Sequence, residues 1–99
     1  MYARMSRARI RPGHKAEVEA LMAALTQQLH ESPGLKYMSS VITEDGELVV
    51  MGFFASKEAA RNTLHVNTRR WTDAAALFST NPVVSEGEVV TFVDVDESV

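Results

Sequence analysis

The segment LKYMSSVITEDGELVVMGFFA, residues 35–55, decides the fold. Two runs of β-forming residues flank the Asp45-Gly46 pair, and an Asp-Gly pair between such runs is a strong signal for a β-hairpin. Apolar side chains fill both faces of the second run, because successive residues of a strand point to opposite faces. One face carries Val49, Met51 and Phe53, and the other carries Leu48, Val50 and Phe54. We therefore expect a central strand with an apolar surface on each side.

Helical patterns lie on both sides of this hairpin. Upstream, residues 14–31 carry apolar side chains at offsets of three, four and seven, which place them on one face of a helix. These residues are Val18, Leu21, Met22, Leu25 and Leu29. Downstream, Ser56 is suited to cap a helix over residues 57–78, in which we expect a break near Val66. Each helix has an apolar face with which to cover the sheet.

Two further strands complete the predicted topology. We expect them at residues 2–11 and, from the segment GEVVTFVDV, at residues 87–95. The element order is then β-α-β-β-α-β, which defines an α+β, ferredoxin-like sandwich. A chain of 99 residues has the usual size of one domain, so we expect residues 1–99 to form a single domain.

The second apolar face of the sheet predicts a partner. Two helices in so short a chain cover one face of a four-stranded sheet, and the other face would remain in water. Exposed apolar surface costs about 25 cal/mol per Å², which a small domain does not tolerate over several large side chains. We therefore expect a homodimer in which the two sheets face each other.

Composition and charge exclude several kinds of site and partner. The chain has no cysteine, which rules out disulfides and thiolate zinc sites, and its three histidines lack metal-ligand spacing. We therefore expect no metal. A formal net charge of −3 disfavours nucleic acid as a partner, and no apolar run reaches the length of a membrane span. The opening residues lack the apolar core of a signal peptide, so we expect a cytoplasmic protein.

Four arginines lie in the first predicted strand, and two interpretations fit them. They are Arg4, Arg7, Arg9 and Arg11. Such a cluster can bind phosphate, but in a ferredoxin-like sheet the last strand lies beside the first. The last segment carries Glu86, Glu88, Asp94, Asp96 and Glu97. We favour cross-strand ion pairs, which contribute about 0.2–1 kcal/mol each, over a phosphate site.

The stretch NTLHVNTRRW, residues 62–71, gathers the polar candidates for a site. Helical spacing predicts a face that packs on the sheet and consists of Ala60, Leu64, Trp71, Ala75 and Phe78. Asn67 is the polar member of that face, and a buried amide needs hydrogen-bond partners or a ligand. His65 belongs to a separate, solvated ladder that also contains Arg61, Arg69 and Asp73.

We interpret this stretch as one wall of a substrate-binding pocket. Asn67 and Trp71 would form that wall, since they lie four residues apart on one helical face. Candidates for the opposite wall are Met51, Phe53 and Tyr37, provided that the Met51 face of its strand looks toward the helices. The alternative is that Asn67 is a core amide satisfied by its neighbours.

Three segments carry a resemblance to a known family. They are RARIRPGHKAE at the first strand–helix junction, ESPGLKYM at the entry to the second strand, and VVMGFFASKEAA from the third strand into the second helix. Through them the chain resembles the antibiotic-biosynthesis-monooxygenase-like proteins over nearly its whole length. The resemblance implies a dimeric α+β barrel with a pocket between the sheet and the helices of each subunit. It also implies cofactor-independent oxygenation of aromatic or quinol-type substrates, or heme degradation, as activities of relatives.

The catalytic residues of those relatives do not recur at the corresponding positions. The asparagine and tryptophan of the polyketide-oxidising members correspond to Met51 and Ala55. The iron-binding histidine of the heme-degrading members corresponds to Asp73, and an aspartate does not replace that imidazole in the usual way. The resemblance therefore implies the fold and the pocket more firmly than a catalytic set.

Three functions compete at this point. We rank first, by analogy with the family, a monooxygenase-like enzyme without metal or organic cofactor that acts on small aromatic, polycyclic or quinol-type substrates. His65 is its candidate catalytic base, because imidazole exchanges protons near neutral pH. The second function is a non-catalytic dimeric module that binds a small hydrophobic metabolite in the same pocket. The third is a structural or regulatory dimer with a filled core.

Overall fold

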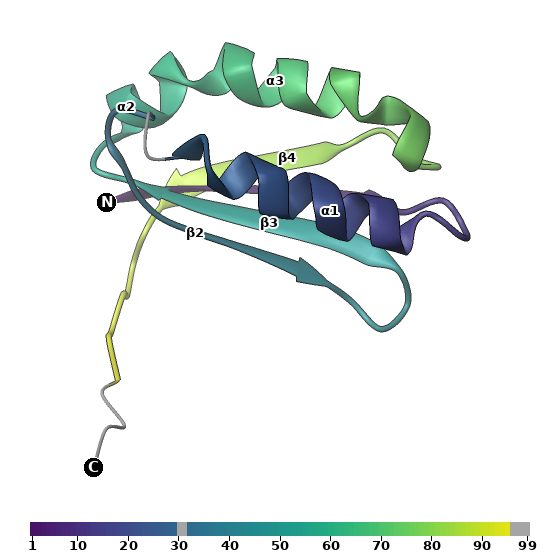
Figure 1. The fold of residues 1–99 in the computed structure, drawn as a ribbon. Helices are drawn as coiled ribbons and strands as arrows, with labels where there is room; N and C mark the ends of the chain where they lie inside the picture. Colours follow the sequence, from purple (N-terminus) through teal and green to yellow (C-terminus); the bar gives the residue numbers. More distant parts are fainter. Residues whose placement is uncertain (30–31, 96–99) are drawn as a thin grey trace.

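The computed structural model describes residues 1–29 and 32–95. Its elements, in chain order, are β1 (Tyr2–Arg9), α1 (Lys15–Thr26), β2 (Leu35–Ile42), β3 (Glu47–Phe54), α2 (Lys57–Asn62), α3 (Leu64–Asp73), the 3₁₀ turn η2 (Ala75–Leu77) and β4 (Val83–Glu88). The strands form one antiparallel sheet in the order β2-β3-β1-β4. The helices lie together on one face of this sheet (Figure 1). The predicted α+β, ferredoxin-like fold class is confirmed.

The β2–β3 hairpin closes at the predicted Asp45-Gly46 pair. Gly46 has a φ of 92°, a left-handed conformation that glycine adopts without a steric penalty. The N–H of Thr43 donates to the carbonyl of Glu47 at 2.8 Å, and the N–H of Gly46 donates to the carbonyl of Thr43 at 3.0 Å. The Thr43 hydroxyl donates to the Asp45 carboxylate, and this bond, helped by Arg9, holds the pKa of Asp45 below its usual value. These contacts fix the register of β3.

Helices cover one of the two apolar faces of β3. Leu48 and Phe54 are 2% and 5% exposed and pack beneath the helices. The odd-numbered residues of β3 point to the opposite face, which continues onto β2 at Tyr37 and Val41, each 54% exposed. Both apolar faces predicted from the alternation are therefore present, and no helix within residues 1–29 and 32–95 covers the second one.

The main core holds α1 and the end of the second helical segment against the sheet. It joins Val18 of α1 to Leu48 of β3 and to Phe78, with Ala8 and Ile10 from the first strand and its extension. Val18 is fully buried, at 0% exposure, and burial of such a side chain contributes about 1.5–3 kcal/mol. A second cluster, formed by Tyr2, Phe54 and Ala60, packs α2 against the other end of the sheet.

The first helix is shorter than predicted. α1 ends at Thr26, and positions 30–31 of the predicted helix over residues 14–31 lie outside the described residues. Among the helices that the structure describes, none is long and apolar enough to cross a membrane.

The second helical segment is divided at Thr63 rather than near Val66. Ser56 caps its first half as predicted and accepts a hydrogen bond from the N–H of Ala59 at 3.1 Å. The Thr63 hydroxyl donates to the carbonyl of Ala60 at 2.9 Å. Such a local side-chain bond competes with the helical ladder, and it lies where α2 ends at Asn62 and α3 begins at Leu64.

The last strand lies earlier in the chain than predicted. β4 spans Val83–Glu88 instead of residues 87–95. The difference arises because β4 pairs with β1, whose first residue is Tyr2. Tyr2 pairs with Glu88, so β1 has no further residue with which the chain after Glu88 could pair. Residues 89–95 leave β4 toward the lower left of Figure 1, and their Phe92 packs against Tyr37 and Phe53 on the face of the sheet opposite the helices.

The predicted pairing of β1 with the last strand is confirmed for Arg4, whose Nε lies 2.9 Å from the Glu86 carboxylate. Other arginines pair with the hairpin instead, because β3 flanks β1 on its other edge. These pairs are Arg7–Glu47 at 3.1 Å and Arg9–Asp45 at 3.5 Å. The predicted partners at positions 96–97 lie outside the described residues.

Gly34 provides a test of the packing between the start of β2 and α2. Its φ is 81°, and a Cβ placed there would lie 2.5 Å from the Cβ of Ala59. Gly13 has a similar φ of 86° but no atom within 4 Å of the same position. We expect Gly13→Ala to cost about 1 kcal/mol of unfolding free energy through its backbone conformation. Gly34→Ala should cost about 1–3 kcal/mol more because of the clash. Urea denaturation measures both values, and equal losses would contradict the close contact.

Candidate functional site

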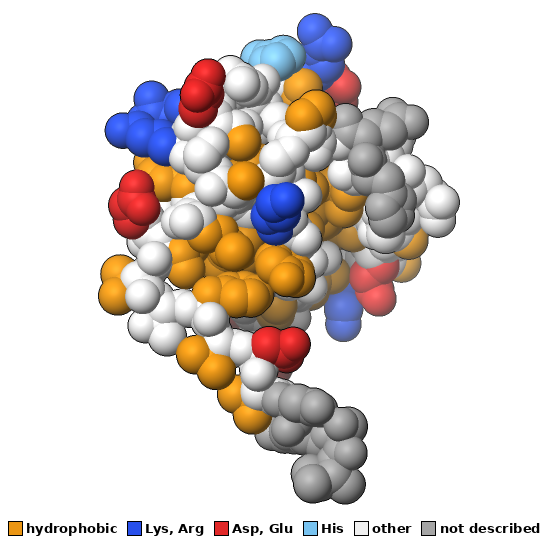
Figure 2. All heavy atoms as spheres, turned by 90° about the vertical axis from the view of Figure 1, so that its left-hand side faces the viewer, with side chains coloured by type: hydrophobic (Ala, Val, Ile, Leu, Met, Phe, Trp, Pro, Cys, Tyr) orange, Lys and Arg blue, Asp and Glu red, His pale blue; other side chains and the backbone are white. Residues whose placement is uncertain are grey.

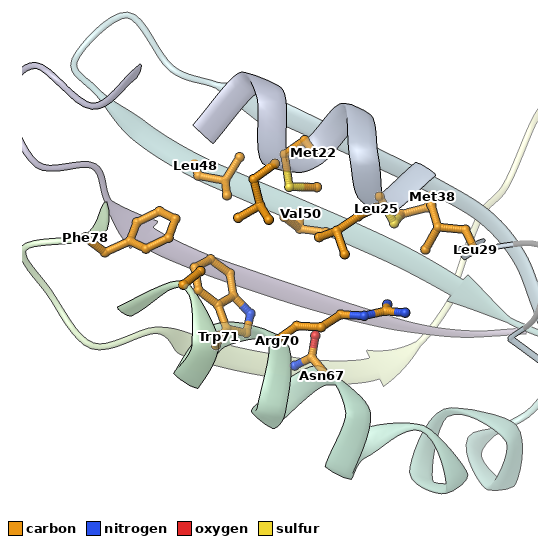
Figure 3. A pocket seen from close by; sticks show the side chains of 12 residues that line it. Met22, Leu25, Leu29, Met38, Leu48, Val50, Asn67, Arg70, Trp71 and Phe78 are labelled. Atoms are coloured by element: carbon orange, nitrogen blue, oxygen red, sulfur yellow. The ribbon is translucent and has the colours of Figure 1, made fainter. Parts of the chain in front are cut away.

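A hollow between the helices and the covered face of the sheet is the candidate site. It has an inner and an outer part, which share the lining residues Leu29, Met38, Val50, Asn67 and Arg70. The inner part has a volume of about 80 Å³ and the outer part a volume of about 410 Å³. The walls come from α1, β2, β3 and α3 (Figure 3). We call the two parts together the helix–sheet cavity.

The inner part of the cavity is apolar. Trp71 and Phe78 close one end, with ring centroids 5.0 Å apart and planes inclined at 61°. This edge-to-face arrangement is favourable for aromatic rings. Met22 and Leu25 of α1 and Leu48 of β3 lie across from them (Figure 3). The inner part is therefore an apolar, aromatic-lined end of the cavity, and its volume of about 80 Å³ is enough for only part of a flat ring system.

The outer part of the cavity is more polar. α3 contributes Asn67, Arg70 and, at the exposed rim, His65. β1 contributes Arg4 and Ser6, which are only 5% and 2% exposed. No group of three or more acidic or histidine side chains in the described part of the chain is placed to hold a metal ion. The cavity thus joins an apolar end to a rim that can bind and orient polar groups.

Arg4 ties the break between α2 and α3 to the sheet. Its Nε donates to the Glu86 carboxylate at 2.9 Å, and its Nη1 donates to the Thr63 hydroxyl at 3.3 Å. Its Nη2 donates to the carbonyl of Ala60. The guanidinium also lies 5.1 Å from the ring centroid of Phe54. All three nitrogens of this side chain have partners within the protein, so Arg4 shapes the cavity wall.

Arg70 has a different environment. It is half-buried and lines both parts of the cavity. No salt bridge joins it to a residue in the ranges 1–29 and 32–95. In Figure 3 its side chain extends from α3 along the cavity toward the end at which Leu29 and Met38 lie. Its guanidinium thus faces the space that a ligand would occupy.

The structure brings the predicted helical residues together. Asn67 and Trp71 line the inner part of the cavity, and Asn67 lines the outer part as well. His65 also lines the outer part, although the predicted charged ladder placed it away from the pocket. These helical residues therefore line the cavity, and their binding of a substrate stays a prediction.

The residues predicted for the opposite wall do not line this cavity. Met51, Phe53 and Tyr37 lie on the face of the sheet that carries no described helix. There Phe92 packs against Tyr37 and Phe53, at ring-centroid distances of 4.9 and 5.3 Å. The cause is the alternation along β3, because its even-numbered residues meet the helices and Met51 must point away. Val50 occupies the wall instead.

Arg70 is a lining residue that the sequence analysis missed. The predicted helical face crosses the break between α2 and α3, which turns Leu64 outward to 37% exposure. Offsets of three and seven from Asn67 alone give Arg70 and Ala74, and both line the cavity. The helical stripe of Asn67, Arg70 and Ala74 was therefore the sequence signal that could have identified Arg70. Ser6 offers no comparable signal, because a lone serine within a strand resembles a surface residue.

Comparison with protein families identifies one match. A family model described as antibiotic biosynthesis monooxygenase matches residues 1–77 of the chain. A comparison with curated proteins finds no match to the sequence.

Several solved structures share the fold. NE2512, a protein of unknown function from Nitrosomonas europaea, has a TM-score of 0.82 at 18% identity, over 96% of this chain and 94% of its own. SnoaB, a cofactor-independent oxygenase from Streptomyces nogalater, has a TM-score of 0.74 at 16% identity, over 93% and 95% of the two chains. Rv0793 from Mycobacterium tuberculosis has a TM-score of 0.69 at 20% identity, over 99% and 98%. At such identities these likenesses show the fold alone.

The Arg4–Glu86 pair can be tested through its effect on stability. In Glu86→Gln, the Arg4 guanidinium, only 5% exposed, would lose its carboxylate partner, and breaking a buried pair costs about 3 kcal/mol. Arg61 pairs with the same carboxylate at 3.5 Å but is 53% exposed, so Arg61→Gln should cost under about 1 kcal/mol. Chemical denaturation at one protein concentration compares the two variants. Equal unfolding free energies for the two variants would mean that loss of the Arg4–Glu86 pair does not itself destabilise the fold.

Proposed function

The chain belongs to the antibiotic biosynthesis monooxygenase family, and from this premise we propose that it oxygenates small aromatic, polycyclic or quinol-type molecules without a metal or organic cofactor. The observation that carries the proposal is the helix–sheet cavity. Two adjoining hollows share five lining residues, one with an apolar end at Trp71 and Phe78 and the other with a polar rim at Asn67 and His65. The likeness in fold to SnoaB, a cofactor-independent oxygenase, supports the same reaction class.

Substrates of this class need little chemical help from a protein. An enolisable aromatic molecule loses a proton from carbon, and the resulting carbanion gives electrons to O₂ directly. In an anthrone, the ring methylene carbon becomes a carbonyl carbon. One atom of O₂ enters the product and the other leaves as water. The protein has to supply orientation, removal of water and a base. In this proposal the lining of the cavity would supply all three without a bound cofactor.

Each candidate residue would have a separate role. Trp71 would hold the flat ring system by contact with its indole. Asn67 would donate a hydrogen bond from its amide to a substrate oxygen and so fix the orientation of the ring. His65 would accept the proton at the rim, where the imidazole can return it to water.

A non-catalytic module that binds a small hydrophobic metabolite is the second candidate function. It is favoured by the environment of His65, which is exposed at the rim rather than enclosed by the cavity. Enzymes usually hold their catalytic base through a partner group that orients it. Under this alternative, an aromatic ligand raises the Tm of the protein and is recovered unchanged.

Oxygen uptake distinguishes the two functions. With an anthrone or a quinol as substrate, the wild-type protein should consume O₂ faster than buffer alone. His65→Ala should lower the rate at least about 100-fold, the usual contribution of a general base. His14→Ala is the matched control, because His14 lies at the start of α1, outside the lining of the cavity, and pairs with Glu17. Uptake that survives in His65→Ala would exclude His65 as the base, and no uptake with any substrate would favour the binding module.

We also propose that the uncovered face of the sheet binds a second copy of the chain. Tyr37 and Val41 of β2 and Met51 and Phe53 of β3 make this face apolar. Phe92 covers only part of it. Figure 2 shows apolar side chains gathered beside the point at which the C-terminal segment leaves the molecule. A small protein rarely leaves such a surface in water, and a two-fold partner would offer the same face in return.

The mass in solution tests this homodimer. Sedimentation equilibrium at micromolar concentration should give the mass of two chains for the wild type. Met51→Glu should give the mass of one chain, because a carboxylate buried between the sheets would have no partner. Ala23→Glu, on the exposed side of α1, should remain a dimer. A wild-type mass of one chain would contradict the proposal.

A further inference from the structure

We propose that the helix–sheet cavity selects ligands that carry a carboxylate, and that Arg70 binds this group. The ligand class is a flat apolar ring system with an acidic group at one end. The proposal deepens the function given above and rests on it for the identity of the site. Binding of the carboxylate depends on the charge and the shape of the cavity, so it can be measured whether or not the protein turns a substrate over.

The first argument is the imbalance of charge within the cavity. In the described parts of the chain, its lining includes Arg4, Arg70 and His65 but no aspartate or glutamate. The chain as a whole has a formal net charge of −3. Glu86 lies outside the lining but neutralises Arg4, so the excess positive charge of the described lining comes from Arg70. A concave site with an excess of one sign of charge attracts the opposite sign.

The second argument is the difference between the two arginines. Glu86 neutralises Arg4 at 2.9 Å and is shared with Arg61 at 3.5 Å. Arg70 has no salt bridge to any residue that the structure describes. A half-buried guanidinium has lost part of its hydration, so a ligand carboxylate would gain more there than at a fully exposed arginine.

The third argument is position. Arg70 precedes Trp71 on α3 and lines both the inner and the outer part of the cavity. Its side chain runs along the cavity toward Leu29 and Met38, while Trp71 lies at the other end (Figure 3). A ring system held at Trp71 would therefore present its far end to the guanidinium. Two parallel N–H···O bonds can then form, because the planar fork of arginine matches a carboxylate.

Neighbouring polar groups can complete the recognition of the acid. Asn67 lies one helical turn before Arg70 and lines both parts of the cavity. Ser6 lines the outer part from β1 and is only 2% exposed, so its hydroxyl is shielded from bulk water. An amide N–H and a hydroxyl can donate to the carboxylate lone pairs that Arg70 does not use. The site thus has donors on both α3 and the sheet.

A charged and a neutral probe with the same ring system test the proposal. 2-Naphthoic acid and 2-naphthamide have the same ring system, and isothermal calorimetry on the full chain measures the Kd of each. The wild type should bind the acid about tenfold or more tightly than the amide, as expected for a hydrogen bond to a charged group. Added NaCl should weaken binding of the acid and leave binding of the amide unchanged. Arg70→Gln should abolish the preference.

Arg69→Gln is the matched control. Arg69 is the exposed neighbour of Arg70 and does not line the cavity, so this variant should keep the full preference. Equal affinity for acid and amide in the wild type, no binding of either, or a preference that persists in Arg70→Gln would each overturn the proposal. Oxygen uptake is measured separately. Selective binding of the acid without oxygen uptake would count against the oxygenase and leave the carboxylate site intact. Oxygen uptake without selectivity for the acid would count against the carboxylate site and leave the oxygenase intact.

Discussion

The alternation of side chains along β3 is the constraint on which the whole molecule depends. A shift of one residue in the register of this strand would exchange Leu48 for Val49 and move the core residues to the wrong face. The turn at Asp45 and Gly46 prevents that shift, because its hydrogen bonds fix the residue at which β3 begins. Once the register is set, one face receives the helices and encloses the cavity. The other face has apolar residues and no described helix above them.

Local signals in the sequence predicted most of the fold but not its long-range details. The Asp45-Gly46 pair, the helical spacing around Val18 and the cap at Ser56 each act over a few residues, and the structure has all three. The position of β4 depends instead on where β1 begins, some eighty residues earlier, since β4 pairs with β1. At the break, Arg4 of β1 donates to the Thr63 hydroxyl and to the carbonyl of Ala60, contacts that also span a long stretch of the chain. Neither could be read from composition or periodicity.

The cavity was predicted in part, for a similar reason. Helical spacing found Asn67 and Trp71, because that spacing is a property of α3 alone. It could not decide which face of β3 meets the helices, since both faces are apolar, and Met51 was placed on the wrong one. The sequence also did not show that Arg4 and Arg70 have different environments. Only the folded chain brings Glu86 to Arg4 and leaves Arg70 beside the cavity without such a partner among the described residues.

The location of Trp71 has a practical consequence. It is the chain's only tryptophan, and it lies at the apolar end of the cavity against Phe78. Its fluorescence therefore reports on one place in the molecule, with no background from other indoles. The colour and intensity of that emission depend on the polarity around the ring, so the protein carries an intrinsic optical sensor for whether this end of the cavity is filled, and no dye has to be attached.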